Sequence, residues 1–146
     1  MTRNSRVIRA LPDQIWDVLS DGWVYPTWVV GATRMRDVEK AWPAVGSSLH
    51  HSAGVWPLVV SDSTEVLEAE PGHRLRLRAR GWPIGEAEVA ITLEAQGADT
   101  LVHIDEDAVA GPGRMVPQPI RAVAIKIRNT ETLRRLAFIA ENRVRG

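Results

Sequence analysis

The segment from Ile120 to Arg143 constrains the fold most, because it contains neither Gly nor Pro. These two residues weaken a helix interior most, so their absence predicts one long C-terminal helix. Apolar residues recur along it at helical spacing in two stripes, Ile120, Val123, Ala124 and Ile127, then Leu133, Leu136, Ala137 and Ala140. The stripes are offset around the axis, so we expect the helix to bend or to change its packing partner near Asn129.

The residues before this helix are typical of antiparallel strands separated by turns. In the segment 73–80, for example, leucines alternate with arginines, and Glu70-Pro71-Gly72 forms a turn before it. The pattern predicts strands at 3–9, 33–39, 46–52, 58–68, 73–80, 86–94 and 100–108, with short helices at 13–20 and 25–30. The predicted class is α+β, with a seven-stranded antiparallel sheet and two short helices after its first strand.

Length and composition exclude several classes of protein. A length of 146 residues is that of one domain, which we assign to 1–146. Cysteine is absent, and Lys plus Arg balance Asp plus Glu at 18 each. Disulfide scaffolds and thiolate sites are therefore excluded, and a nucleic-acid partner is not expected. No signal core or membrane span is visible, so we expect a cytoplasmic protein. The sequence does not decide the oligomeric state, and a homodimer is one of the states it permits.

Four segments together resemble one known superfamily. They are residues 10–19 (ALPDQIWDVL), 28–32 (WVVGA), 66–75 (VLEAEPGHRL) and 128–136 (RNTETLRRL). The chain is similar to the START/Bet v 1-like (SRPBCC) superfamily, of the polyketide cyclase/dehydrase and lipid-transport type. This resemblance implies a helix-grip fold, in which a curved sheet wraps around the C-terminal helix and leaves a cavity for a hydrophobic molecule. The superfamily includes carriers and cyclases and has no universal catalytic residue, and we expect no cofactor.

Polar residues on the apolar face of the sheet are the candidates for a site, because their burial is unfavourable unless they are paired or functional. Glu106 shares a strand face with Val102 and Ile104, so we expect it to point inward. Desolvation there would favour the protonated carboxyl, a candidate general acid or base. Alternatively, Glu106 lies half-exposed at the rim or binds an arginine. His51, in phase with Leu49, is either a ligand-binding or proton-carrying group or an ordinary core histidine.

Further candidates follow from position. Asp62 is in phase with the apolar residues of its strand, but a hairpin centred near residues 54–55 would not place it directly opposite His51. We expect Trp28 and Trp56 to form cavity walls, and Met115 to line the entrance. Asn129 lies in mid-helix and needs a polar partner. The four histidines match no zinc spacing, so no metal site is predicted.

These observations lead to three hypotheses. The first is a carrier or sensor that binds a hydrophobic, ring-containing small molecule, oriented by Glu106, His51 and Asn129. The second is an enzyme of the polyketide cyclase/dehydrase type, in which Glu106 and His51 transfer protons. The third is a protein-interaction domain whose cavity is vestigial.

Overall fold

The computed structural model describes residues 1–30, 32–53, 60–81 and 85–145. Its elements are β1 (Thr2–Ile8), α1 (Pro12–Ser20), η1 (Gly22–Val24), α2 (Tyr25–Trp28), β2 (Ala32–Val38), β3 (Ser48–Ala53), β4 (Val60–Glu70), β5 (Arg74–Gly81), β6 (Gly85–Gln96), β7 (Asp99–Ala110), η2 (Pro112–Met115) and α3 (Gln118–Arg145). Each predicted strand and helix is present, with boundaries shifted by a few residues. Among the described residues, the helices are too short or too polar to span a lipid bilayer.

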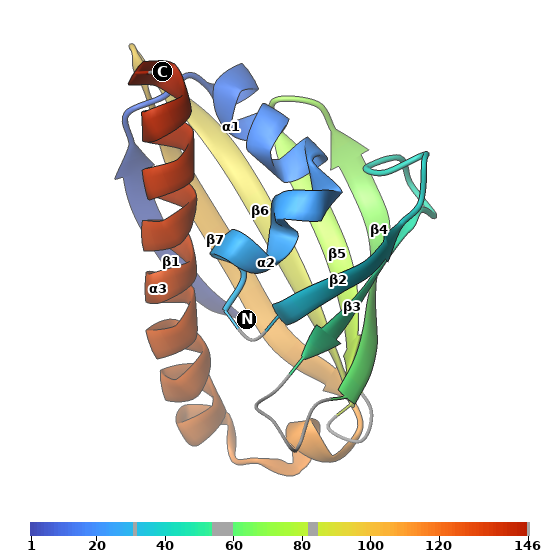
Figure 1. Ribbon diagram of the computed structural model, residues 1–146. Helices are drawn as coiled ribbons and strands as arrows, with labels where there is room; N and C mark the ends of the chain where they lie inside the picture. Colours follow the sequence, from blue (N-terminus) through green and yellow to red (C-terminus); the bar gives the residue numbers. More distant parts are fainter. Residues whose placement is uncertain (31, 54–59, 82–84, 146) are drawn as a thin grey trace.

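The seven strands form one antiparallel sheet in the order β1-β7-β6-β5-β4-β3-β2. The sheet curves, and α3 lies across its hollow near β1 and β7 (Figure 1). The short helices α1 and α2 cover the same hollow from beside α3. A curved sheet around a long C-terminal helix is the architecture that the family resemblance implies.

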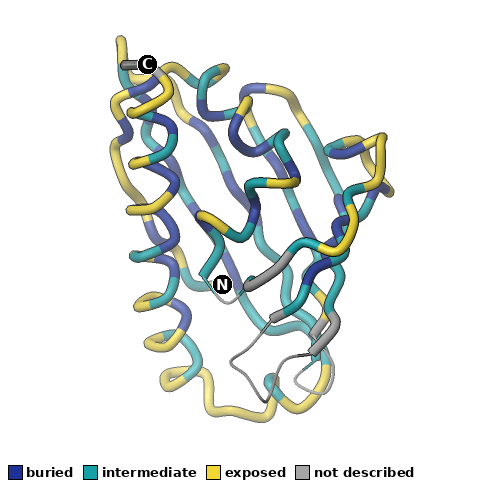
Figure 2. Tube along the Cα trace, viewed as in Figure 1, coloured by how far each residue is buried: buried dark blue, intermediate teal, exposed yellow. Residues whose placement is uncertain are grey.

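The core lies where α1 and the C-terminal half of α3 meet the sheet. Fully buried side chains there include Ile15, Val18, Leu133, Leu136 and Ile91. Figure 2 shows the buried positions gathered along the inner face of α3 and the facing strands. The other half of the hollow, beside α2 and the middle of α3, is filled less completely.

A glycine fixes the position of α2 over the hollow. A Cβ atom at Gly22 would lie 2.6 Å from Cδ2 of Leu49 and 2.8 Å from Cγ1 of Val38. Only a residue without a side chain lets η1 approach β2 and β3 this closely. Tyr25 and Trp28, which follow directly, are thereby held against the concave face of the sheet.

The structure corrects the predicted packing of α3. Ile120, Val123 and Ile127 of the first stripe are 62%, 59% and 70% exposed. The buried face instead runs through Ile125, Asn129, Thr132, Leu133, Leu136 and Ala140, at one continuous helical spacing. The first stripe is therefore not a packing face, because the inner face of the first half of α3 runs through Ile125 and Asn129 and adjoins a cavity. The expected bend or change of packing partner near Asn129 stays a prediction.

Candidate functional site

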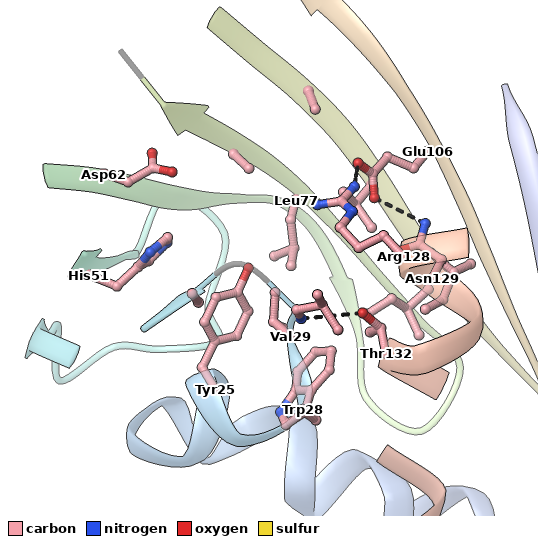
Figure 3. A pocket seen from close by; sticks show the side chains of 17 residues that line it. Tyr25, Trp28, Val29, His51, Asp62, Leu77, Glu106, Arg128, Asn129 and Thr132 are labelled. Carbon is pink, nitrogen blue, oxygen red and sulfur yellow. Dashed lines mark hydrogen bonds and ion pairs between the residues drawn. The ribbon is translucent and has the colours of Figure 1, made fainter. Parts of the chain in front are cut away.

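A cavity of about 330 Å³ lies between the concave face of the sheet, α2 and the middle of α3 (Figure 3). Its volume is within the range of small-molecule sites, about 300–1,000 Å³. Most of the surface is apolar, and the polar side chains gather at two ends. The lining residues are Tyr25, Trp28, Val29, Val30, Ala32, His51, Asp62, Leu77, Ala79, Ala87, Val89, Ile91, Ile104, Glu106, Arg128, Asn129 and Thr132.

One polar end is built around Glu106, which is 4% exposed and points inward as expected. Arg128 donates from Nη2 to Oε2 of this carboxyl group, and Asn129 donates from Nδ2 to Oε1 over 3.1 Å. Each oxygen therefore accepts a hydrogen bond, which fits the carboxylate rather than the acid. Of the alternatives drawn from the sequence, the structure shows an inward carboxylate that is bound by an arginine. Because both Glu106 oxygens accept hydrogen bonds from the protein, the group is not arranged for general acid catalysis.

Arg128 reaches this position from α3. Its side chain is 38% exposed, against 6% for that of Glu106, so the pair lies between the cavity and the surface. Burial lowers the pKa of Arg128, which reflects a guanidinium that has lost part of its hydration. The next turn of α3 is tied to the segment after α2, because the backbone N–H of Val30 donates to Oγ1 of Thr132 over 3.3 Å.

The other polar end contains His51, which is 4% exposed. Its Nε2 lies 3.0 Å from Oγ1 of Thr64, and its ring centroid lies 5.3 Å from that of Tyr25. Burial lowers the pKa of His51, so the imidazole is neutral at physiological pH. Nδ1 is buried and has no hydrogen-bond partner among the described residues. A buried ring nitrogen in this state can bind a polar atom of a ligand.

Asp62 lies beside His51, which corrects the predicted register. The two residues are direct partners in the β3–β4 ladder, so their side chains share one face at neighbouring positions. The offset expected from the sequence was wrong because it assumed a hairpin centre at 54–55, which lies outside the described residues, whereas the ladder runs from the pair Ser48–Glu65 to the pair Ala53–Val60 and so places His51 opposite Asp62. Burial raises the pKa of Asp62 to about 6, while the Ser63 N–H and Arg36 act in the opposite direction.

This raised pKa predicts a pH-dependent stability. The folded protein binds the Asp62 proton more tightly than the unfolded chain does, so the free energy of unfolding falls as pH rises from about 4 to about 6. Asp62→Asn removes this penalty and retains an oxygen for the Ser63 N–H. We expect the variant to be more stable by about 1 kcal/mol near pH 7, after allowance for partial solvent screening, and to show no gain near pH 4.

Urea unfolding of the wild type and Asp62→Asn at several pH values measures the difference in their free energies of unfolding. Titrating groups that the two proteins share contribute equally to both and cancel in this difference. A variant that is less stable than the wild type near neutral pH would instead show that the ionised carboxylate is favourably paired, for example with a charged His51.

The remaining candidates from the sequence differ in where the structure places them. Trp28 is 2% exposed, lines the cavity and packs edge-on against Tyr25, with ring centroids 5.3 Å apart. Trp56 lies outside the described residues. Met115 is 85% exposed and is not among the residues that line the cavity, so its predicted place at the entrance is corrected. It lies in η2, beyond the end of β7, where its side chain extends into solvent.

Among the polar lining residues, sequence reasoning missed Arg128, Thr132 and Tyr25. Arg128 lies next to Asn129 and one turn before Thr132, and this polar run inside a predicted buried helix was the available signal. Tyr25 is 6% exposed, its hydroxyl lies 3.5 Å from Oγ1 of Thr64, and burial raises its pKa. A tyrosine before Pro26 gives no comparable signal, because core packing explains it equally well.

Comparisons with known proteins agree with this architecture. A family model described as polyketide cyclase / dehydrase and lipid transport matches residues 2–141. Protein CV1439 from Chromobacterium violaceum is 20% identical, with a TM-score of 0.73 over 95% of this chain and 96% of that one. Ara h 8.0201 is 8% identical, with a TM-score of 0.73 over 96% of each chain.

A third structure belongs to DynU16, a putative protein in the dynemicin biosynthetic locus, which is 22% identical with a TM-score of 0.68. The likeness covers 96% of this chain and 46% of DynU16. No curated protein matches the sequence. At these identities the solved structures establish the helix-grip fold, and the family match establishes the relationship. The chain belongs to the polyketide cyclase/dehydrase and lipid-transport family.

Proposed function

We propose that this protein binds a hydrophobic, ring-containing small molecule in the cavity between sheet and α3, as a carrier or sensor. The observation that carries the proposal is the cavity itself, which is lined mostly by aliphatic and aromatic side chains and has polar groups at two ends. Burial of apolar ligand surface supplies affinity, and a few polar groups supply orientation. The flat faces of Tyr25 and Trp28 suit a ring system.

Blocking the cavity tests this proposal. Ala79 and Ala87 face each other across β5 and β6, and both line the cavity. Ala87→Phe would place a ring in the space that a ligand needs. We expect the neutral probe N-phenyl-1-naphthylamine to bind the wild type with a rise in fluorescence, and Ala87→Phe to weaken binding by about tenfold or more.

Ala95→Phe is the matched control, because Ala95 is exposed on the same strand and does not line the cavity. It should leave probe binding unchanged. A wild type that does not bind the probe, or an Ala87→Phe variant that binds it equally well, would refute the proposal.

One observation favours an enzyme of the polyketide cyclase/dehydrase type as a second candidate. Asp62, with a pKa near 6, and the neutral His51 are direct cross-strand neighbours inside the cavity. Such a pair is suited to proton transfer. In this form of the hypothesis Asp62 replaces Glu106, whose oxygens are both bound. Liquid chromatography with mass spectrometry of the recovered ligand separates the candidates, because a carrier returns its ligand unchanged in both mass and retention time, whereas ring closure changes the retention time and loss of water changes the mass.

A further inference from the structure

The two polar ends of the cavity lie on opposite sides of an apolar floor. Figure 3 shows Asp62 and His51 on one side and Glu106, Arg128 and Asn129 on the other, with Leu77 between them. Asp62 belongs to β4 and Glu106 to β7, which β5 and β6 separate in the sheet. Three inter-strand steps correspond to about 14 Å across the strands, and the ladders align Glu106 with Val66, four residues along β4 from Asp62, which adds to the separation. A ligand that contacts both ends must therefore be elongated, with one polar group at each end.

The Arg128 end supplies unused hydrogen-bond donors. A guanidinium carries five N–H groups, and its described bond to Glu106 uses one of them, at Nη2. The group lines the cavity above Leu77 and is partly desolvated (Figure 3). Desolvated donors are unfavourable without acceptors, so a ligand oxygen that accepts from Arg128 would complete this end.

The same end does not favour an anion. Glu106 already neutralises Arg128, and the lining contains no second Lys or Arg among its described residues. Asp62 adds a further acid to the cavity, and its raised pKa shows that the site disfavours negative charge. A carboxylate ligand would bring an uncompensated charge beside Glu106 into this desolvated space. A neutral carbonyl oxygen accepts from the guanidinium without that penalty.

The Asp62 end supplies an acceptor. Its Oδ1 accepts the Ser63 N–H over 2.7 Å, and within the described part of the chain Oδ2 is left for another donor. A ligand hydroxyl fits this position better than an ammonium group, because the guanidinium of Arg36 binds the backbone oxygen of Asp62 over 3.1 Å and would repel a second cation. His51, through Nδ1, is the neighbouring polar group that such a hydroxyl also meets.

We propose that the ligand is a neutral, elongated molecule whose carbonyl-type oxygen accepts hydrogen bonds from Arg128 and whose hydroxyl group, at the opposite end, donates to Asp62. This inference rests on the proposed binding function and specifies its ligand class. Arg128 is the residue that selects a neutral acceptor over a carboxylate and over a ligand without an acceptor.

Three matched naphthols test the proposal by isothermal titration calorimetry. 6-Acetyl-2-naphthol has both groups, 6-ethyl-2-naphthol lacks the acceptor, and 6-hydroxy-2-naphthoate replaces it with an anion. We expect the ketone to bind the wild type about tenfold more tightly than either of the others, the size of effect typical of a hydrogen bond to a charged donor. The comparison needs no variant, so it stands even if substitutions unfold the protein.

The variant that tests Arg128 is Arg128→Met/Glu106→Gln, which keeps the charge balance and replaces the charged guanidinium donors with the neutral amide N–H groups of the new side chain. We expect its preference for the ketone over the ethyl compound to fall to about twofold or less. Arg134→Met, on the exposed face of α3, is the matched control and should retain the wild-type preference. For the other end, Asp62→Ala should lower affinity for 6-acetyl-2-naphthol but not for its methyl ether.

The outcomes distinguish the two proposals. Equal affinity of the wild type for all three naphthols, or tighter binding of the carboxylate, would overturn the neutral-ligand inference and leave the binding function intact. If none of the three binds, the neutral-ligand inference fails, and the binding of N-phenyl-1-naphthylamine decides separately whether the binding function stands. A double variant that is folded and retains the full ketone preference would remove Arg128 from ligand selection.

Discussion

Arg128→Met should lower the free energy of unfolding by about 3 kcal/mol, at the lower end of the range for breaking a buried ion pair because Arg128 is partly exposed. The substitution leaves the Glu106 carboxylate, whose side chain is 6% exposed, with the Asn129 amide as its remaining partner in the described structure. An unpaired charge in that position loses hydration without compensation. Urea unfolding followed by far-ultraviolet circular dichroism measures the loss.

The double variant Arg128→Met/Glu106→Gln is the control for this interpretation. The amide that replaces the Glu106 carboxylate keeps an oxygen for the Asn129 side chain but carries no charge, so most of the lost stability should return, to within about 1 kcal/mol of the wild type. If the single variant loses less than about 1 kcal/mol, water reaches Glu106 and the pair does not behave as buried. If the double variant is no more stable than the single one, packing of the Arg128 stem explains the loss instead.

The strands could be predicted from the sequence because each has one wet face. In β5, Leu75 and Leu77 are buried, while Arg78 and Arg80 on the other face bind Glu86 over 2.7 and 3.0 Å. Alternation of this kind identifies a strand even when its predicted ends are wrong by one or two residues. The inward direction of Glu106 was predictable for the same reason, since it follows from the phase of its strand.

The partners of the site residues could not be predicted in the same way. Arg128 lies 22 residues from Glu106 in the chain and reaches it from another element, so only the packing of α3 on the sheet brings them together. The His51–Asp62 pair depends on the register of β3 and β4. A change of hairpin centre by a single residue moves every partner in such a ladder. Phase along one strand is a local property, whereas pairing between elements is not.

The misassigned face of α3 has a related cause. Periodicity identifies a buried face by its apolar residues, but a helix that lines a cavity presents polar groups inward. Asn129 and Thr132 are 3% and 4% exposed, whereas Ile127 is 70% exposed. The error in the prediction therefore marks the part of α3 where the function is expected.

Leu136→Ala should lower the free energy of unfolding by about 3 kcal/mol, because it removes a fully buried side chain and leaves a cavity in a rigid part of the core. Leu136 lies on the inner face of α3, where that helix meets α1 and the sheet. The far-ultraviolet spectrum of the folded variant should not change, since Ala favours helix. Urea unfolding measures the change in stability from the shift in midpoint at constant slope.

Ile127→Ala on the same helix provides the contrast, because the two substitutions are alike in chemistry and differ in burial. Ile127 is 70% exposed, so its truncation should change the free energy of unfolding by less than about 0.5 kcal/mol. Had the two apolar stripes of α3 packed as the sequence suggested, both variants would lose several kcal/mol. A loss above about 1 kcal/mol for Ile127→Ala would show that the outer stripe is covered in solution, and its dependence on protein concentration would then tell whether a second copy covers it.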